Sequence, residues 1–185
     1  MNRLATAAAG LAVALLAVAH TAAAADSKAT IARGKYLVNM GGCTDCHTPG
    51  NFLGHPDMAR YLGGSDVGFA IPGLGVFVGR NLTPDKDTGL GGWTRAQIIT
   101  VFTTGKRPDG RQLAPIMPYE AYSRLTKSDD NAIAAFLQSL KPVSHKVDGP
   151  FGPKDKVTVF VMDVLPADVY NSLPPPPAPP PPAGK

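Results

Sequence analysis

The sequence predicts an all-α domain of three main helices with a mostly irregular C-terminal extension. The segments 27–40, 94–104 and 127–140 each combine apolar residues at helical spacing with residues that begin or end helices. The 20 glycines and 19 prolines fall mainly between and after these segments, so the rest of the domain is expected to be loops. The 48–79 stretch is the longest of these predicted loops.

The first and third helices are expected to pack against each other. Gly34 interrupts the 27–40 segment, and a glycine costs helix stability unless it has a packing purpose. We expect it to let the 127–140 helix approach closely, with Phe136 or its neighbours near it.

Boundary signals are strong for the second and third helices. Thr94 is a good N-cap, Gln97 completes a capping box, and Gly105 suits the C-terminal end. Thr126 caps the third helix and Pro142 stops it.

The sequence that follows the first helix is Cys43-Thr44-Asp45-Cys46-His47. A C-x-x-C-H run is typical of c-type haem attachment. The two cysteines form thioether bonds to one haem, and His47 then ligates the iron from the proximal face. We therefore predict one covalent haem c.

Other uses of these residues stay open as alternatives. Thiol exchange is expected beside a β-α-β pattern, which is missing here. A zinc site needs four ligands, and His55, in a polar loop, is the nearby candidate for the fourth. A disulfide between residues this close would stabilise little, because the benefit grows with loop length.

Met117 is the predicted sixth ligand of the iron. Flanking prolines hold it in a stiff, extended segment, which suits a thioether that reaches the iron from the distal side. Met40 lies too near the attachment turn, Met58 lies in a flexible stretch, and Met162 lies in the C-terminal extension. The alternative is a methionine that fills the core.

The chain divides into four parts. Residues 1–25 have one positive side chain, an apolar run and small residues before the end, as in a secretory signal peptide. The run is shorter than the ~20 residues that span a bilayer, so we expect a soluble periplasmic protein with no membrane span after cleavage. The predicted domain is 26–142, a C-terminal extension packed on it is 143–173, and a proline-rich tail is 174–185.

The extension and the tail have open roles. The apolar run 157–162 is expected to lie on the domain as an extended segment or short strand, or to dock a partner. The tail holds two runs of four prolines and is expected to be a polyproline II or disordered spacer, or a docking handle.

The charge of the chain is modestly positive. Eighteen Lys and Arg face fourteen Asp and Glu, and removal of residues 1–25 takes away one arginine. This balance does not suggest nucleic acid binding, which needs a concentrated basic stripe. Lys106, Arg107 and Arg111, just before Met117, are expected to contact a haem propionate, to steer an acidic partner, or to be solvated turn charges.

The stretch 33–142 resembles the cytochrome c fold of the single-haem type, and in detail the haem domains of bacterial dehydrogenase-associated cytochromes. The matching motifs are Arg33-Gly34-Lys35-Tyr36-Leu37, Cys43-x-x-Cys46-His47-Thr48, Asn81-Leu82-Thr83-Pro84-Asp85, Thr88-Gly89-x-Gly91-Gly92-Trp93, Arg107-Pro108-Asp109-Gly110-Arg111 and Met117-Pro118-Tyr119. The resemblance implies that Cys43 and Cys46 hold the haem, that His47 and Met117 are its axial ligands, and that three main helices surround it. The alcohol, aldehyde and gluconate dehydrogenase subunits of this kind carry three such domains, whereas this chain has one C-x-x-C-H.

The expected function is electron transfer, not catalysis. We expect a periplasmic carrier that passes one electron at a time between a dehydrogenase and a respiratory acceptor such as an oxidase. One alternative is a haem enzyme, or a gas- or peroxide-binding cytochrome, with a displaceable sixth ligand. Another is a fixed electron-transfer subunit of a dehydrogenase complex.

Overall fold

The structure is a computed structural model that describes residues 26–175. The predicted signal peptide 1–25 and most of the proline-rich tail, 176–185, lie outside the described residues. Within 26–175 no helix has the length and apolar character needed to cross a membrane.

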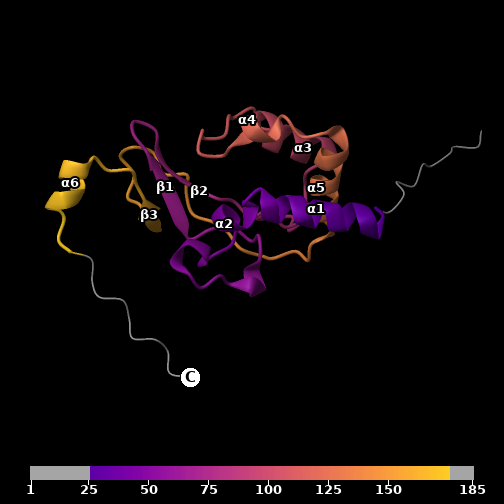
Figure 1. Cartoon of the computed structure of the whole chain (residues 1–185), viewed down its shortest axis with the longest axis horizontal. Helices are drawn as coiled ribbons and strands as arrows, with labels where there is room; N and C mark the ends of the chain where they lie inside the picture. Colours follow the sequence, from indigo (N-terminus) through magenta and orange to yellow (C-terminus); the bar gives the residue numbers. More distant parts are fainter. Residues whose placement is uncertain (1–25, 176–185) are drawn as a thin grey trace, which may run out of the picture.

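Six α-helices are found in the described part of the chain. They are α1 (Lys28–Met40), α2 (Cys43–His47), α3 (Arg95–Thr104), α4 (Tyr119–Tyr122), α5 (Lys127–Ser139) and α6 (Ala167–Ser172). The three longest confirm the predicted helices, including the capping box of α3 and the Thr126 cap of α5. Figure 1 shows α1, α3, α4 and α5 together at one end of the molecule, with α2 near its centre.

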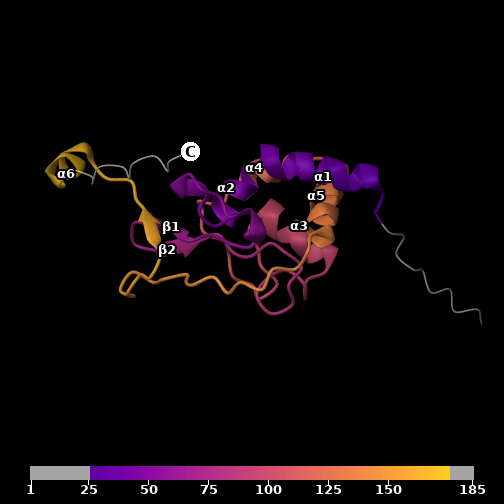
Figure 2. The same cartoon turned by 90° about the horizontal axis from the view of Figure 1, so that it is seen from below.

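The α1–α5 contact depends on Gly34. The two helices cross one another rather than running side by side (Figure 2). A Cβ atom added at Gly34 would lie 1.9 Å from the carbonyl oxygen of Ala132 and 2.7 Å from the Cβ of Phe136. The predicted close approach is therefore confirmed, and no side chain larger than hydrogen fits at this position.

The prediction of an all-α fold is wrong, because the chain also forms a three-stranded mixed sheet. The strands are β1 (Val67–Ile71), β2 (Gly75–Val78) and β3 (Phe160–Met162), in the order β2-β1-β3. β1 pairs antiparallel with β2, so that Phe69 lies opposite Phe77. β1 pairs in parallel with β3, so that Val67 lies opposite Phe160.

The sheet was missed for a physical reason. Glycine and proline around β1 and β2 favour a loop, and strand preference depends on the neighbouring strand more than on local sequence. β3 comes from the C-terminal extension and completes the sheet from far along the chain. The predicted loop at 48–79 is thus in part a β-hairpin, whereas the short strand expected within 157–162 is confirmed.

The C-terminal extension runs back along the domain as an extended chain before it reaches the sheet (Figure 2). The carbonyl of Val143 accepts a hydrogen bond from the Asn81 side chain at 2.7 Å, and the Nδ1 of His145 donates to the carbonyl of Gly63 at 2.7 Å. Phe151 pairs with Val76 of β2. Beyond β3, α6 stands at the far end of the molecule in both views (Figures 1 and 2).

The buried core lies between α1, α3 and α5, with one contribution from the loop after α2. Its members are Val38, Leu62, Ile98, Phe102, Ile133, Ala134, Phe136 and Leu137. This core supports one side of a large cavity, which is described below.

We predict that Gly34→Ala lowers the free energy of unfolding by about 1–3 kcal/mol, because the added methyl group must push α1 away from the α5 backbone. Gly92→Ala is the matched control, since a Cβ atom there would meet nothing within 4 Å. Urea unfolding of both holoproteins, followed by circular dichroism, measures the difference. Equal stability of the two variants would contradict the packing role of Gly34.

Candidate haem-binding site

A cavity of about 1380 Å³ opens beside the core, and it is lined mainly by apolar side chains. Cys43, Cys46 and His47 line it from one wall. Met117 lines it from the segment between α3 and α4. The four residues predicted from the sequence are therefore brought to the same cavity.

The two cysteines are presented by a single helical turn. Gly42 adopts a left-handed conformation with φ 65°, which only glycine takes easily, and it turns the chain from the end of α1 into α2. Cys43 and Cys46 are three residues apart in this turn, so their thiols share one side. His47 is the last residue of the turn.

Burial keeps both thiols protonated at neutral pH. It raises the pKa of Cys43 to about 11, and it also raises the pKa of Cys46. A redox-active C-x-x-C pair instead needs a lowered thiol pKa, because the thiolate is the nucleophile. This environment does not favour the thiol-exchange alternative.

The His47 ring is fixed by one hydrogen bond. Its Nδ1 lies 2.6 Å from the carbonyl oxygen of Arg80. A carbonyl can only accept, so Nδ1 carries the proton and Nε2 keeps its lone pair. Burial lowers the pKa of His47, against the opposing effect of this carbonyl, and the ring is held in the neutral form that a metal ligand requires.

Gly79 allows the Arg80 carbonyl to reach His47. A Cβ atom at Gly79 would lie 1.7 Å from the carbonyl oxygen of Cys46 and 3.3 Å from the His47 Nδ1. Sequence reasoning missed Gly79 and Arg80, although both directly precede the motif that begins at Asn81. Only the fold brings this segment against the attachment turn.

Met117 lies in a short, stiff segment at the edge of the core. Its amide donates to the carbonyl of Ala114 at 3.0 Å, and its carbonyl accepts from the amide of Tyr119 at 2.8 Å. Pro118 directly precedes α4. The Met117 side chain is partly buried against the core cluster, so one face of it is already packed.

The other candidate ligands are less well situated. Met40 also lines the cavity, but 69% of it is exposed to solvent. Met58 and Met162 are exposed and lie outside the cavity wall. His55 and His145 do not line the cavity either.

A basic wall closes one side of the cavity. Arg107 and Arg111 line it, whereas Lys106 is exposed and does not. Arg80 lines it too, and its guanidinium donates hydrogen bonds to the carbonyls of Val147 and Gly149 in the extension. Burial lowers the pKa of Arg80, and the nearby charges of Arg107 and Arg111 lower it further. Arg107 and Arg111 both pair with the Asp109 carboxylate, at 3.3 and 2.8 Å, so this wall already accommodates one carboxylate group.

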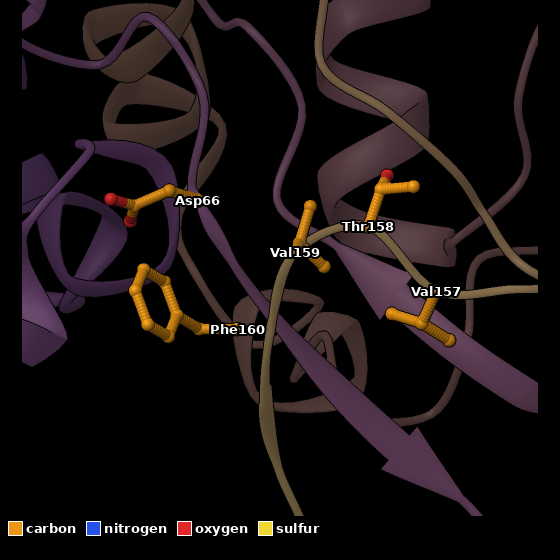
Figure 3. A pocket seen from close by; sticks show the side chains of 5 residues that line it. All are labelled: Asp66, Val157, Thr158, Val159 and Phe160. Atoms are coloured by element: carbon orange, nitrogen blue, oxygen red, sulfur yellow. The ribbon is translucent and has the colours of Figure 1, made fainter.

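A second, smaller pocket lies away from these residues. It has a volume of about 460 Å³ and forms where the segment that enters β3 passes the start of β1. Figure 3 shows Asp66 and Phe160 on one side of it and Val157 on the other. Because the Asp66 carboxylate already accepts a hydrogen bond from the Gly50 amide at 3.0 Å, we assign no chemistry to this pocket.

The residues of the large cavity fit a c-type haem. Two protonated thiols are spaced as C-x-x-C, a neutral imidazole has a free Nε2, a thioether lies in the same cavity, and three arginines can face propionates. No group of three His, Cys, Asp or Glu side chains gathers within residues 26–175 in a way that could hold a metal ion, so the zinc alternative finds no ligand set there.

Comparison with known families gives the same result. Residues 31–141 match the family described as cytochrome c, and this match covers more than half of the chain. The chain belongs to the cytochrome c family. The predicted resemblance is thereby confirmed, and it extends to cytochrome subunits of dehydrogenases.

Three relatives illustrate this. The cytochrome is 37% identical over 133 residues to the fructose dehydrogenase cytochrome subunit of Gluconobacter japonicus, with 69% of this chain and 26% of the relative aligned. It is 34% identical over 142 residues to the cytochrome c subunit of the quinone alcohol dehydrogenase of Gluconobacter oxydans. That alignment covers 75% of this chain and 28% of the relative. It is 33% identical over 128 residues to the gluconate 2-dehydrogenase cytochrome c subunit of Pantoea cypripedii. That alignment covers 67% of this chain and 27% of the relative. This cytochrome therefore spans little more than a quarter of each relative.

We predict that Gly79→Ala reduces the yield of haem-loaded cytochrome severalfold, because the methyl group would collide with the Cys46 carbonyl and displace the Arg80 carbonyl from His47. Gly152→Ala is the control, because Gly152 does not line the cavity and a Cβ atom there would meet only the Asp155 side chain, at 3.3 Å. The haem absorbance per protein in purified samples measures the effect. An unchanged haem content would contradict the requirement for close approach at Gly79.

Proposed function

We propose that this cytochrome is a periplasmic electron carrier that passes one electron at a time through a single His/Met-ligated c-type haem. The observation that carries the proposal is one cavity lined by the two cysteines of C-x-x-C-H, by His47 and by Met117. The chain contains two cysteines, enough for one such attachment. Membership of the cytochrome c family supports the same reading.

Each residue has a defined part in this proposal. The thiols of Cys43 and Cys46 would hold the haem through two thioether links, His47 would coordinate the iron through Nε2, and Met117 would coordinate it through its sulfur. When bound, the haem supplies a reversible one-electron Fe(III)/Fe(II) couple.

The chain contributes rigidity to the proposed ligands. The Arg80 carbonyl fixes the His47 ring, and the prolines beside Met117 limit the movement of its backbone. Ligands that keep their positions in both oxidation states make the reorganisation on electron transfer small. A thioether ligand also favours the reduced state and raises the potential.

The basic wall has an electrostatic part. The positive charges of Arg80, Arg107 and Arg111, beyond the part balanced by Asp109, would offset those of the two haem propionates, since unpaired charges are costly to bury. Arg107 also lies over the Trp93 ring, 5.2 Å from its centre, which restrains its guanidinium.

We infer that the electron donor is a dehydrogenase and that the acceptor belongs to a respiratory chain. The relatives named above are cytochrome subunits of fructose, alcohol and gluconate dehydrogenases, and this supports a dehydrogenase donor. In the proposed division of the chain, 1–25 directs export to the periplasm, 26–142 forms the haem domain, and 143–173 and 174–185 follow as extension and tail.

A second candidate is a subunit fixed to a dehydrogenase. The end of the extension favours it, because this region exposes an unusual run of large apolar side chains: Phe160, Val161, Met162, Val164, Leu165, Val169, Tyr170 and Leu173. Exposed apolar patches of this kind often mark protein contacts. A stable complex with a dehydrogenase in periplasmic extracts would favour the fixed subunit over a free carrier.

We predict that Met117→Leu lets the reduced cytochrome bind carbon monoxide and lowers its midpoint potential by more than about 59 mV, the shift for a tenfold change in the relative stability of two one-electron redox states. Met40→Leu, at the exposed rim of the same cavity, should change neither property. A redox titration and a carbon monoxide difference spectrum measure both. If Met40→Leu produced these effects and Met117→Leu did not, Met40 would be the ligand.

A further inference from the structure

The segment that carries Met117 is bonded mostly to itself and to the end of α3. The Leu113 amide donates to the Gly105 carbonyl at 2.8 Å, and the Met117 and Tyr119 backbone bonds lie within the segment. The attachment turn, 41–47, forms another part of the cavity wall. A contact between segment 113–122 and this turn is needed to set the distance between the two proposed ligands.

Tyr122 provides such a contact. Its hydroxyl donates a hydrogen bond to the carbonyl oxygen of Gly41 at 2.6 Å. Gly41 lies two residues before Cys43, and Tyr122 lies five residues after Met117. The ring is packed there as well, since a Cβ atom at Gly41 would lie 3.4 Å from the Tyr122 Cε1. The bond therefore joins the two walls of the cavity directly.

The Tyr122 hydroxyl remains a donor over the whole working pH range. Burial raises the pKa of the phenol above its usual value, so the hydroxyl keeps its proton. The Gly41 carbonyl can only accept, so the direction of the bond is fixed.

We propose that Tyr122 is a positioning residue that holds the Met117 segment against the attachment turn and so favours the methionine–iron bond over an external ligand. This inference rests on the proposed His/Met ligation. It predicts that loss of one hydroxyl, without loss of the ring, weakens the hold of Met117 on the iron while the domain stays folded.

Tyr61 offers a matched control on the same helix end. Its hydroxyl donates to the Asn39 side-chain oxygen at 3.0 Å, so Tyr61→Phe also removes one tyrosine hydrogen bond to the last turn of α1. Tyr61 does not line the cavity and does not belong to the Met117 segment. The two variants therefore differ in whether the lost bond reaches that segment.

The experiment compares the wild-type, Tyr122→Phe and Tyr61→Phe holoproteins. We expect Tyr122→Phe to weaken the long-wavelength sulfur-to-iron band and to speed carbon monoxide binding to the reduced protein by about three- to tenfold, as for loss of one ordinary hydrogen bond. Tyr61→Phe should match the wild type in both readouts. Urea unfolding of each variant reports global stability separately.

Two results would overturn the inference, and they are distinguishable. If the wild type shows the band and resists carbon monoxide, but Tyr122→Phe behaves like Tyr61→Phe, Tyr122 has no positioning role while the proposed function stands. If the wild type lacks the band and binds carbon monoxide readily, the His/Met ligation fails and the inference fails with it.

Discussion

The hydrogen bond from His47 Nδ1 to the Arg80 carbonyl is the constraint on which the rest of the site depends. It fixes the ring in one tautomer and one orientation, and it exists because Gly79 lets the chain pass within contact of the Cys46 carbonyl. The proposed proximal ligand is therefore oriented by the backbone, and no second side chain has to be desolvated to do so.

The segment that orients His47 is in turn bonded to the C-terminal extension, which also supplies one strand of the sheet. The carbonyl of Arg80 accepts the hydrogen bond from His47, and the Arg80 guanidinium donates hydrogen bonds to the carbonyls of Val147 and Gly149. Asn81 binds Val143, and β3 pairs with β1. The extension is thus bonded to the segment that orients His47, whereas α3 and the Met117 segment line another part of the cavity.

Local signals predicted the three main helices well. The caps at Thr94 and Thr126 and the role of Gly34 depend on neighbours a few residues away or on helix packing, which sequence patterns record. The sheet and the Arg80 contacts could not be predicted, because each joins segments that are far apart in the chain. The C-x-x-C-H motif indicated the cofactor, but the carbonyl that orients His47 leaves no side-chain signal.

The most direct test of the central claim is the visible spectrum of the wild-type protein, oxidised and reduced, with and without carbon monoxide. The account predicts a low-spin spectrum with the weak long-wavelength sulfur-to-iron band and only slow binding of carbon monoxide by the reduced protein. A high-spin spectrum, or ready binding of carbon monoxide, would contradict it. The iron would then have an open position, and a haem enzyme or gas-binding cytochrome would be the better description.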